Sequence, residues 1–349
     1  MPGFFSWIKG RFSQTPPRPP DSAPRLLNPN SIPEENEPKD TGAEVSIRQL
    51  EECLFCWLLD TTPRDLNETL SASSLLILDK LEQKVRRQSL DELPRQPMTL
   101  PMLSRCLSDD NADRKELTRI ILSDPALTDQ LLHVANSPSF RPGEKSIESV
   151  DQAVFMLGMN GIRNVISAAI MRPMMGARNS REALFAQRVW RWGLTCAKAA
   201  ELVGRLGEKN DSNYFMTGLL PALAYMTLRR ELIGICKTTA PTTEPPANLV
   251  HQALSQYQWA TAQILATTWK LSPDYHARLL AAERPAPDHS PSPLTDGIII
   301  GTREILRHAH QKNMAEEDLL KLVQIAPEQF TRIRRIILDS IEADSRGRA

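Results

Sequence analysis

The chain has 349 residues, of which 41% are hydrophobic, so it is long enough to bury a sizeable core in one main domain with flanking pieces. Its 42 basic and 42 acidic residues leave no net charge, which excludes the long-range attraction that a basic protein exerts on nucleic acid, and we expect no nucleic-acid partner. No apolar run reaches the roughly 18 residues of a membrane span, and five cysteines without a secretory segment favour a reduced, cytoplasmic protein.

Residues 1–43 are predicted to be a disordered, proline-rich tether with an amphipathic tip. They hold nine of the 27 prolines, and the stretch 13–42 has too few aliphatic residues to offset the entropy cost of ordering it. The tip carries apolar side chains at roughly helical spacing, namely Phe4, Phe5, Trp7, Ile8 and Phe12. Because these candidate docking residues have no core of their own, we expect them to contact the domain, a partner protein or, peripherally, a membrane surface.

Residues 44–92 are predicted to be a helical extension. Apolar residues recur at helical spacing from Glu44 until Pro63 ends the first helix, and residues 66–87 are predicted as a second helix.

The next segment, up to Pro173, is marked by helix caps and stops. These signals are capping boxes at Asp113 with Glu116 and at Ser149 with Gln152, an N-cap at Asp124 before Pro125, a stop at Asn136-Ser137-Pro138, and a left-handed cap at Gly158. Asn136 and Ser137 are interpreted simply as the end of a helix. A further helix is predicted from Asn160 until Pro173 ends it.

The remainder of the chain also has helical periodicity. The predicted helices span residues 181–206, 214–230 with a kink at Pro221, 249–257, 259–270, 273–283, 297–312, 316–325 and 328–341, with a second linker at 285–293. No strand pattern of period two stands out, so the predicted fold class is all-α. We divide the chain into residues 1–43, 44–92, 93–286 and 287–349, the last being a linker with C-terminal helices.

Four motifs follow one another in the main domain: Asp124-Pro125-Ala126-Leu127, Leu131-Leu132-x-x-Ala135-Asn136-Ser137, Ala153-Val154-x-x-Leu157-Gly158 and Arg163-Asn164. In sequence and spacing they resemble the HDOD family, which is related to the metal-dependent HD phosphohydrolases. The resemblance covers about residues 93–283. It implies an HD-like helical bundle, and a role as a signalling or regulatory module.

The resemblance also shows where metal ligands would be expected. HD relatives carry Gly-Leu-Leu-His-Asp-Ile-Gly, whereas this chain has Gly218-Leu219-Leu220-Pro221-Ala222-Leu223-Ala224 at the corresponding place. Proline and alanine side chains offer no lone pair to a cation. Downstream, Trp259 stands where relatives have a histidine, and Ala281-Ala282-Glu283 stands where paired histidines follow. We therefore expect no catalytic residue, no metal ligand and no cofactor.

Cysteines do not suggest a second chemistry. Cys53 and Cys56 have the spacing of redox and zinc motifs, but no second cysteine pair and no βα pattern accompany them, so we interpret both as small core residues. Cys106, Cys196 and Cys236 have no histidine nearby in sequence to act as a general base. No nucleophile is predicted.

Charged residues near the C-terminus are interpreted in the same way. His308 and His310, about 200° apart on a predicted helix, cannot bind one ion together and are expected at the surface. Arg332, Arg334 and Arg335 are expected on a solvated face of mixed charge.

These observations favour a non-catalytic bacterial signalling or regulatory protein that acts through contacts with a partner protein. Two alternatives remain open: a sensor that binds a nucleotide second messenger in the vestigial HD cleft, and a metal-dependent HD-type phosphodiesterase with ligands arranged differently. The sequence leaves the partner and the oligomeric state open.

Overall fold

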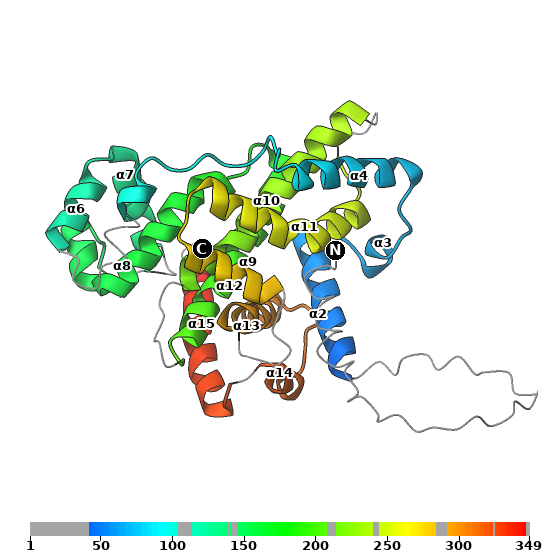
Figure 1. The fold of residues 1–349 in the computed structure, drawn as a ribbon. Coiled ribbons are helices and arrows are strands. Elements are labelled where there is room, and N and C mark those ends of the chain that lie inside the picture. The colour runs from blue at the N-terminus through cyan, green and yellow to red at the C-terminus, as the bar shows by residue number, and fades with distance from the viewer. Residues whose placement is uncertain are drawn as a thin grey trace, which may run out of the picture.

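A computed structural model defines the architecture (Figure 1). It describes residues 42–103, 114–137, 140, 145–207, 214–239, 244–283, 292–323 and 325–346. Every regular element within these ranges is a helix and none is a strand, which confirms the all-α prediction.

The described helices follow one another along the chain. They are α2 (Gly42–Leu59), α3 (Pro63–Leu66), α4 (Ala72–Arg86), α6 (Arg114–Leu122), α7 (Pro125–Ala135), α8 (Val150–Met175), α9 (Ser180–Gly204), α10 (Tyr214–Thr239), α11 (Ala247–Thr268), α12 (Pro273–Glu283), α13 (Pro293–His308), α14 (Glu316–Leu322) and α15 (Pro327–Arg346). In Figure 1, α6, α7 and the start of α8 lie at one end of the molecule, and α3 and α4 lie toward the other.

The helical extension differs from its prediction at one boundary. A single helix was expected over residues 66–87. Instead, a capping box of Thr62 and Asp65 starts the one-turn helix α3, which ends at Leu66. The longer helix α4 then starts at Ala72, after its N-cap Ser71. α4 then buries Ile77, Leu81 and Val85 at four-residue steps against α10 and α11.

The N-caps predicted at Asp124 and Ser149 are confirmed, whereas Pro173 does not end its helix but lies inside α8, which continues to Met175. The side chain of Asp124 accepts a hydrogen bond from the backbone N–H of Leu127 at 3.0 Å, and the side chain of Ser149 accepts one from the backbone N–H of Gln152 at 3.2 Å. Gly158 has φ 65° and ψ 179°, a conformation open almost only to glycine, and it breaks α8 into two parts. The capping box expected at Asp113 lies outside the described residues.

One helix of the described chain, α8, is long and apolar enough to cross a membrane. It packs against α6, α7, α9 and α10, and much of it is buried among them. This environment is typical of a core helix.

The central helices are longer and less divided than predicted. α10 continues past Arg230 to Thr239, and α11 runs without interruption through Gln258, where a boundary was expected between two helices. No glycine or proline stands at that point, and both neighbours of Gln258 are buried. The change in the apolar pattern is therefore a polar residue inside the core, not a helix end.

The C-terminal helices join the core through α13. Among the described helices, α13 and α9 form the most extensive contact. A Cβ atom placed on Gly297 would lie 2.3 Å from the Cα of Ala200, and one on Gly301 would lie 2.6 Å from the Cα of Cys196. Because glycine has no Cβ, the two backbones can approach this closely. α13 starts at Pro293, four residues before its predicted start, because Ser292 provides an N-cap.

Candidate functional site

The positions expected to hold metal ligands lie on α10, in the middle of the helix bundle. Pro221 and Ala222 are buried, and Ala222 faces α9 so closely that a Cβ atom on Gly193 would lie 2.6 Å from its Cβ. One turn earlier, a Cβ on Gly218 would lie 2.7 Å from the Cα of Ala197. The α9–α10 contact is thus a direct backbone approach through small residues, and these two side chains bring no donor atom to it.

The downstream positions are equally poor in donors. Trp259 is buried, Ala282 is fully buried, and Glu283 at the end of α12 is only partly covered. Among the residues that the structure describes, no group of three histidine, cysteine, aspartate or glutamate side chains could hold a metal ion.

Trp269 has a structural role where α11 ends. Its indole N–H donates to the carbonyl of Pro94 at 2.9 Å, and its own carbonyl accepts the side-chain amide of Gln96 at 2.6 Å. The segment that opens the main domain is therefore fixed to α11.

A group of buried polar side chains between α10 and α11 was not predicted. Gln258, Thr261 and Tyr225 are each fully buried, and the polar atoms of their side chains have no hydrogen-bond partner within the described chain. The Tyr225 ring stacks on Trp192 with centroids 4.9 Å apart. Such residues have no sequence signature, because burial of a glutamine or tyrosine depends on which helices cover it.

Asn136 and Asn164, from two of the quoted motifs, have structural roles. Asn136 does more than end α7. Its side-chain NH2 group donates a hydrogen bond to the Ile147 carbonyl at 2.7 Å, and its side-chain oxygen accepts one from the Ile147 backbone N–H at 2.7 Å. Asn164 donates at 2.8 Å to Glu201, a fully buried carboxylate on α9 that also accepts from Lys198 and Arg205. These contacts stabilise the fold, and they engage the Glu201 carboxylate within it.

The described cysteine thiols are unsuited to nucleophilic chemistry. Cys53 and Cys56 are half-buried against the core, and burial raises the pKa of both, that of Cys56 to about 11. Burial also raises the pKa of Cys196 and Cys236. Cys106 lies outside the described residues.

The C-terminal charges differ in part from their prediction. Arg332 and Arg335 are exposed, as expected, but Arg334 donates to Glu316 at 2.8 Å and lies 3.5 Å from the fully buried Glu304. Arg334 therefore helps to hold α15 against α13 and α14. The prediction that His308 and His310 share one helix is wrong, because α13 ends at His308 and His310 lies beyond it.

The candidate docking residues Phe4, Phe5, Trp7, Ile8 and Phe12 lie outside the described residues.

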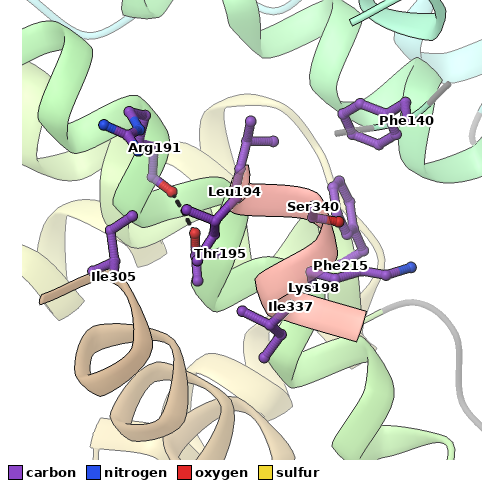
Figure 2. A pocket seen from close by; sticks show the side chains of 10 residues that line it. Phe140, Arg191, Leu194, Thr195, Lys198, Phe215, Ile305, Ile337 and Ser340 are labelled. Atoms are coloured by element: carbon purple, nitrogen blue, oxygen red, sulfur yellow. Dashed lines mark hydrogen bonds between the residues drawn. The ribbon is translucent and has the colours of Figure 1, made fainter. Parts of the chain in front are cut away.

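Two of the hollows that the described residues line are open to the surface. One, of about 360 Å³, lies between α2, α3 and α9, where Arg188 bonds to Asp60 at 3.0 Å and to the Trp57 carbonyl. The Arg188 guanidinium is therefore already bound to groups of the fold itself. The other is an apolar cavity where α9 and α10 meet α13 and α15 (Figure 2).

The fold defines an HD-like helical domain. At the two positions on α10 where metal-binding side chains were expected, it carries Pro221 and Ala222. Comparison with protein families matches the HDOD domain over residues 93–285, more than half of the chain. The chain belongs to the HDOD family.

Solved structures show the same fold. A candidate metal-dependent phosphohydrolase from Shewanella amazonensis SB2B is 19% identical with a TM-score of 0.55, and the match covers 77% of this chain and 99% of that one. An HDOD domain protein of unknown function from Geobacter sulfurreducens is 18% identical with a TM-score of 0.50, and the match covers 78% and 94%. No curated protein sequence matches the chain.

Proposed function

We propose that this protein is a non-catalytic signalling or regulatory protein of bacteria, which acts by binding a partner protein through its HDOD domain. Membership of the family supports a regulatory role. In this proposal the helical bundle provides a rigid surface, and the interior has a structural purpose only.

The observation that carries the proposal is the packing of α10 at Pro221 and Ala222. Hydrolysis of a phosphate ester by this fold requires a bound cation that activates water, and a cation requires oxygen or nitrogen donors converging on one point. Here the two positions carry aliphatic groups, and Gly193 of α9 lies directly against Ala222. The same close approach leaves no room for a nucleotide at this place, so we favour protein binding over nucleotide sensing.

Metal content tests this proposal directly. The full chain should contain far less than one equivalent of any divalent metal by inductively coupled plasma mass spectrometry, both as purified and after incubation with Mn²⁺ followed by desalting. It should also fail to hydrolyse bis(p-nitrophenyl) phosphate. One or two tightly bound divalent ions per chain, or hydrolysis that EDTA abolishes, would establish the phosphodiesterase alternative instead.

A further inference from the structure

The apolar cavity where α9 and α10 meet α13 and α15 has room for one aliphatic side chain. It encloses about 50 Å³, whereas one water requires about 10–15 Å³ and a cavity that binds benzene measures about 150 Å³. Its apolar walls include Leu194 of α9, Phe215 of α10, Ile305 of α13, Ile337 of α15 and the Phe140 ring (Figure 2). An aliphatic side chain therefore suits this space better than an aromatic ring does.

The fold holds these walls in place. The Phe215 ring meets the Phe140 ring edge to face with centroids 5.9 Å apart, and Ile305 is buried. The Thr195 hydroxyl donates to the Arg191 carbonyl at 2.8 Å, so this polar group of the lining is satisfied within α9. The cavity is therefore preformed, and it selects an occupant by its shape and its apolar surface.

Charge does not select the occupant. Lys198, a basic residue of the lining, lies 3.0 Å from the Glu201 carboxylate and forms an ion pair with it. Arg191 also has an interaction within the chain. We therefore expect apolar contact to hold the occupant, with little dependence on salt.

The N-terminal tip carries an apolar stripe centred on an isoleucine. On the helix that their spacing predicts, Phe4, Phe5 and Phe12 lie three or four residues from Ile8 and therefore share its face. Ile8 is also the only aliphatic residue in the sequence from Phe4 to Phe12. The predicted tip thus presents one aliphatic side chain among aromatic ones, which matches a cavity that accepts one aliphatic side chain.

The tether is long enough for the tip to reach the cavity. Residues 13–41 join Phe12 to α2, and a chain of this length spans about 30 Å as a loose coil and about 90 Å as extended polyproline II. α2 begins at Gly42 and packs against α9 and α13, two of the helices that line the cavity. Since α2 itself is only about 27 Å long, the tether covers the distance.

Tethering favours the tip over a separate molecule. One buried side chain provides too little free energy to offset the freedom that a separate partner loses on binding, whereas a tethered segment has an effective concentration on the order of millimolar. The family match covers residues 93–285, so the tip precedes it and α13 and α15 follow it. The cavity and the tip thus both involve parts of the chain outside the shared domain.

We propose that the N-terminal tip docks into this cavity, with the Ile8 side chain inside and Phe4, Phe5 and Phe12 packed around the opening. The tip is then an intramolecular ligand, and while it is docked it closes an apolar surface of the helical bundle to other proteins. The inference goes beyond the proposed function and does not depend on it, because it concerns a contact within the chain.

Methyl NMR of the full chain tests the contact. The δ1-methyl signals of Ile305 and Ile337, assigned through Ile305→Val and Ile337→Val, report on the cavity that these residues line. Ile8→Asp places a charge in an apolar site and should release the tip, so that both signals move. Ile32→Asp, the matched control within the tether, should leave both signals in place. The response should be the same at a lower protein concentration and at high salt, because the contact is intramolecular and apolar.

A synthetic peptide and a filled cavity locate the contact. Added to the Ile8→Asp chain at millimolar concentration, a Met1–Phe12 peptide should return the Ile305 signal toward its original position, and the peptide with Ile8→Asp should bind at least about tenfold more weakly. Leu194→Trp fills the cavity, so in that chain Ile8→Asp should cause no further change. Leu184→Trp, on an exposed part of α9, should preserve the response. The peptide titration leaves the core unaltered, so the test stays decisive even if tryptophan at position 194 disturbs packing.

Several results would overturn the inference. These are unchanged cavity signals in the Ile8→Asp chain, changes confined to methyl groups away from the cavity, a response to the peptide that persists in the Leu194→Trp chain, or a response that disappears on dilution and so belongs to the tip of a second copy. Bound divalent metal would refute the proposed function without bearing on this contact.

Discussion

Glu51 is a carboxylate on the face of α2 that meets α11. Its side chain accepts a hydrogen bond from the Ser255 hydroxyl at 2.8 Å, and one turn further on Phe55 packs on His251 with ring centroids 4.5 Å apart. Burial raises the pKa of Glu51 from its ordinary 4.5 to about 7, although the Ser255 hydrogen bond and the nearby Arg48 act in the opposite direction. The ionised form therefore opposes docking of α2 near neutral pH.

Replacing this carboxylate should stabilise the protein only at higher pH. Because the folded state binds the Glu51 proton more tightly than the unfolded state, the free energy of unfolding falls as pH rises from about 4.5 to 7, and the full penalty persists above 7. Glu51→Gln removes the charge and can still accept from Ser255. We expect a gain of about 1–3 kcal/mol at pH 8 and no gain at pH 4.5, measured by urea unfolding.

Glu52→Gln, one residue along α2, is the matched control for this experiment. A gain of equal size for both variants, or a gain for Glu51→Gln that does not depend on pH, would contradict the assignment of the penalty to the Glu51 carboxylate.

At the residue scale, the sequence predicted what local geometry determines. Asp124 and Ser149 cap helices whose first turns follow directly, and Gly158 adopts a conformation that its lack of a Cβ permits. Glu51 could not be identified in this way, because its partner Ser255 lies 204 residues away. The buried side chain of Gln258 has the same origin, since its environment is made by other helices.

At the element scale, the contact between α9 and α13 depends on two glycines of α13. Gly297 and Gly301 lie directly against the backbone of α9 at Ala200 and Cys196, and the Trp192 indole N–H donates to Thr302 at 2.9 Å beside them. A side chain at either glycine would force the helices apart, because the nearest atoms belong to backbone that cannot rotate away.

Two glycine-to-alanine substitutions separate this packing effect from helix propensity. Alanine is about 1 kcal/mol better than glycine within a helix, yet Gly297→Ala should lower the free energy of unfolding by about 1–3 kcal/mol through overpacking. Gly234→Ala, on an exposed part of α10 with open space around its Cβ position, should raise it by about 0.5–1 kcal/mol. Chemical denaturation measures both, and stabilisation by both variants would show that α13 can move off α9 at little cost.

Helix boundaries were predictable where a breaker residue marks them. Asp124-Pro125 starts α7 as expected, whereas the expected boundary near Gln258 does not exist, because periodicity alone cannot distinguish a buried polar residue from a helix end. The family resemblance also located the α10 segment, and the structure added what the motif could not: the direct approach of Gly193 to Ala222 that fills the place of the ligands.

At the scale of the whole molecule, the family match and the structural core have different limits. The HDOD match ends at residue 285, but α13, α14 and α15 follow it and share the core. Ile298, Ile300 and Phe330 are fully buried. The sequence motifs could not show this, because the contacts depend on glycine spacing and apolar stripes that no family motif describes.

A chain ended at residue 285 should therefore lose its fixed tertiary structure. Removal of α13 exposes the small-residue face of α9 and leaves the Trp192 indole without Thr302. We expect strong binding of the dye ANS, loss of the near-ultraviolet circular dichroism signal and a non-cooperative thermal transition, with helical far-ultraviolet signal partly retained. A chain that starts at Gly42 is the control, since the residues before it are predicted to be a tether, and it should unfold cooperatively near the temperature of the full chain. If the chain ended at residue 285 also unfolds cooperatively with a native near-ultraviolet spectrum, the main domain is stable without α13, α14 and α15.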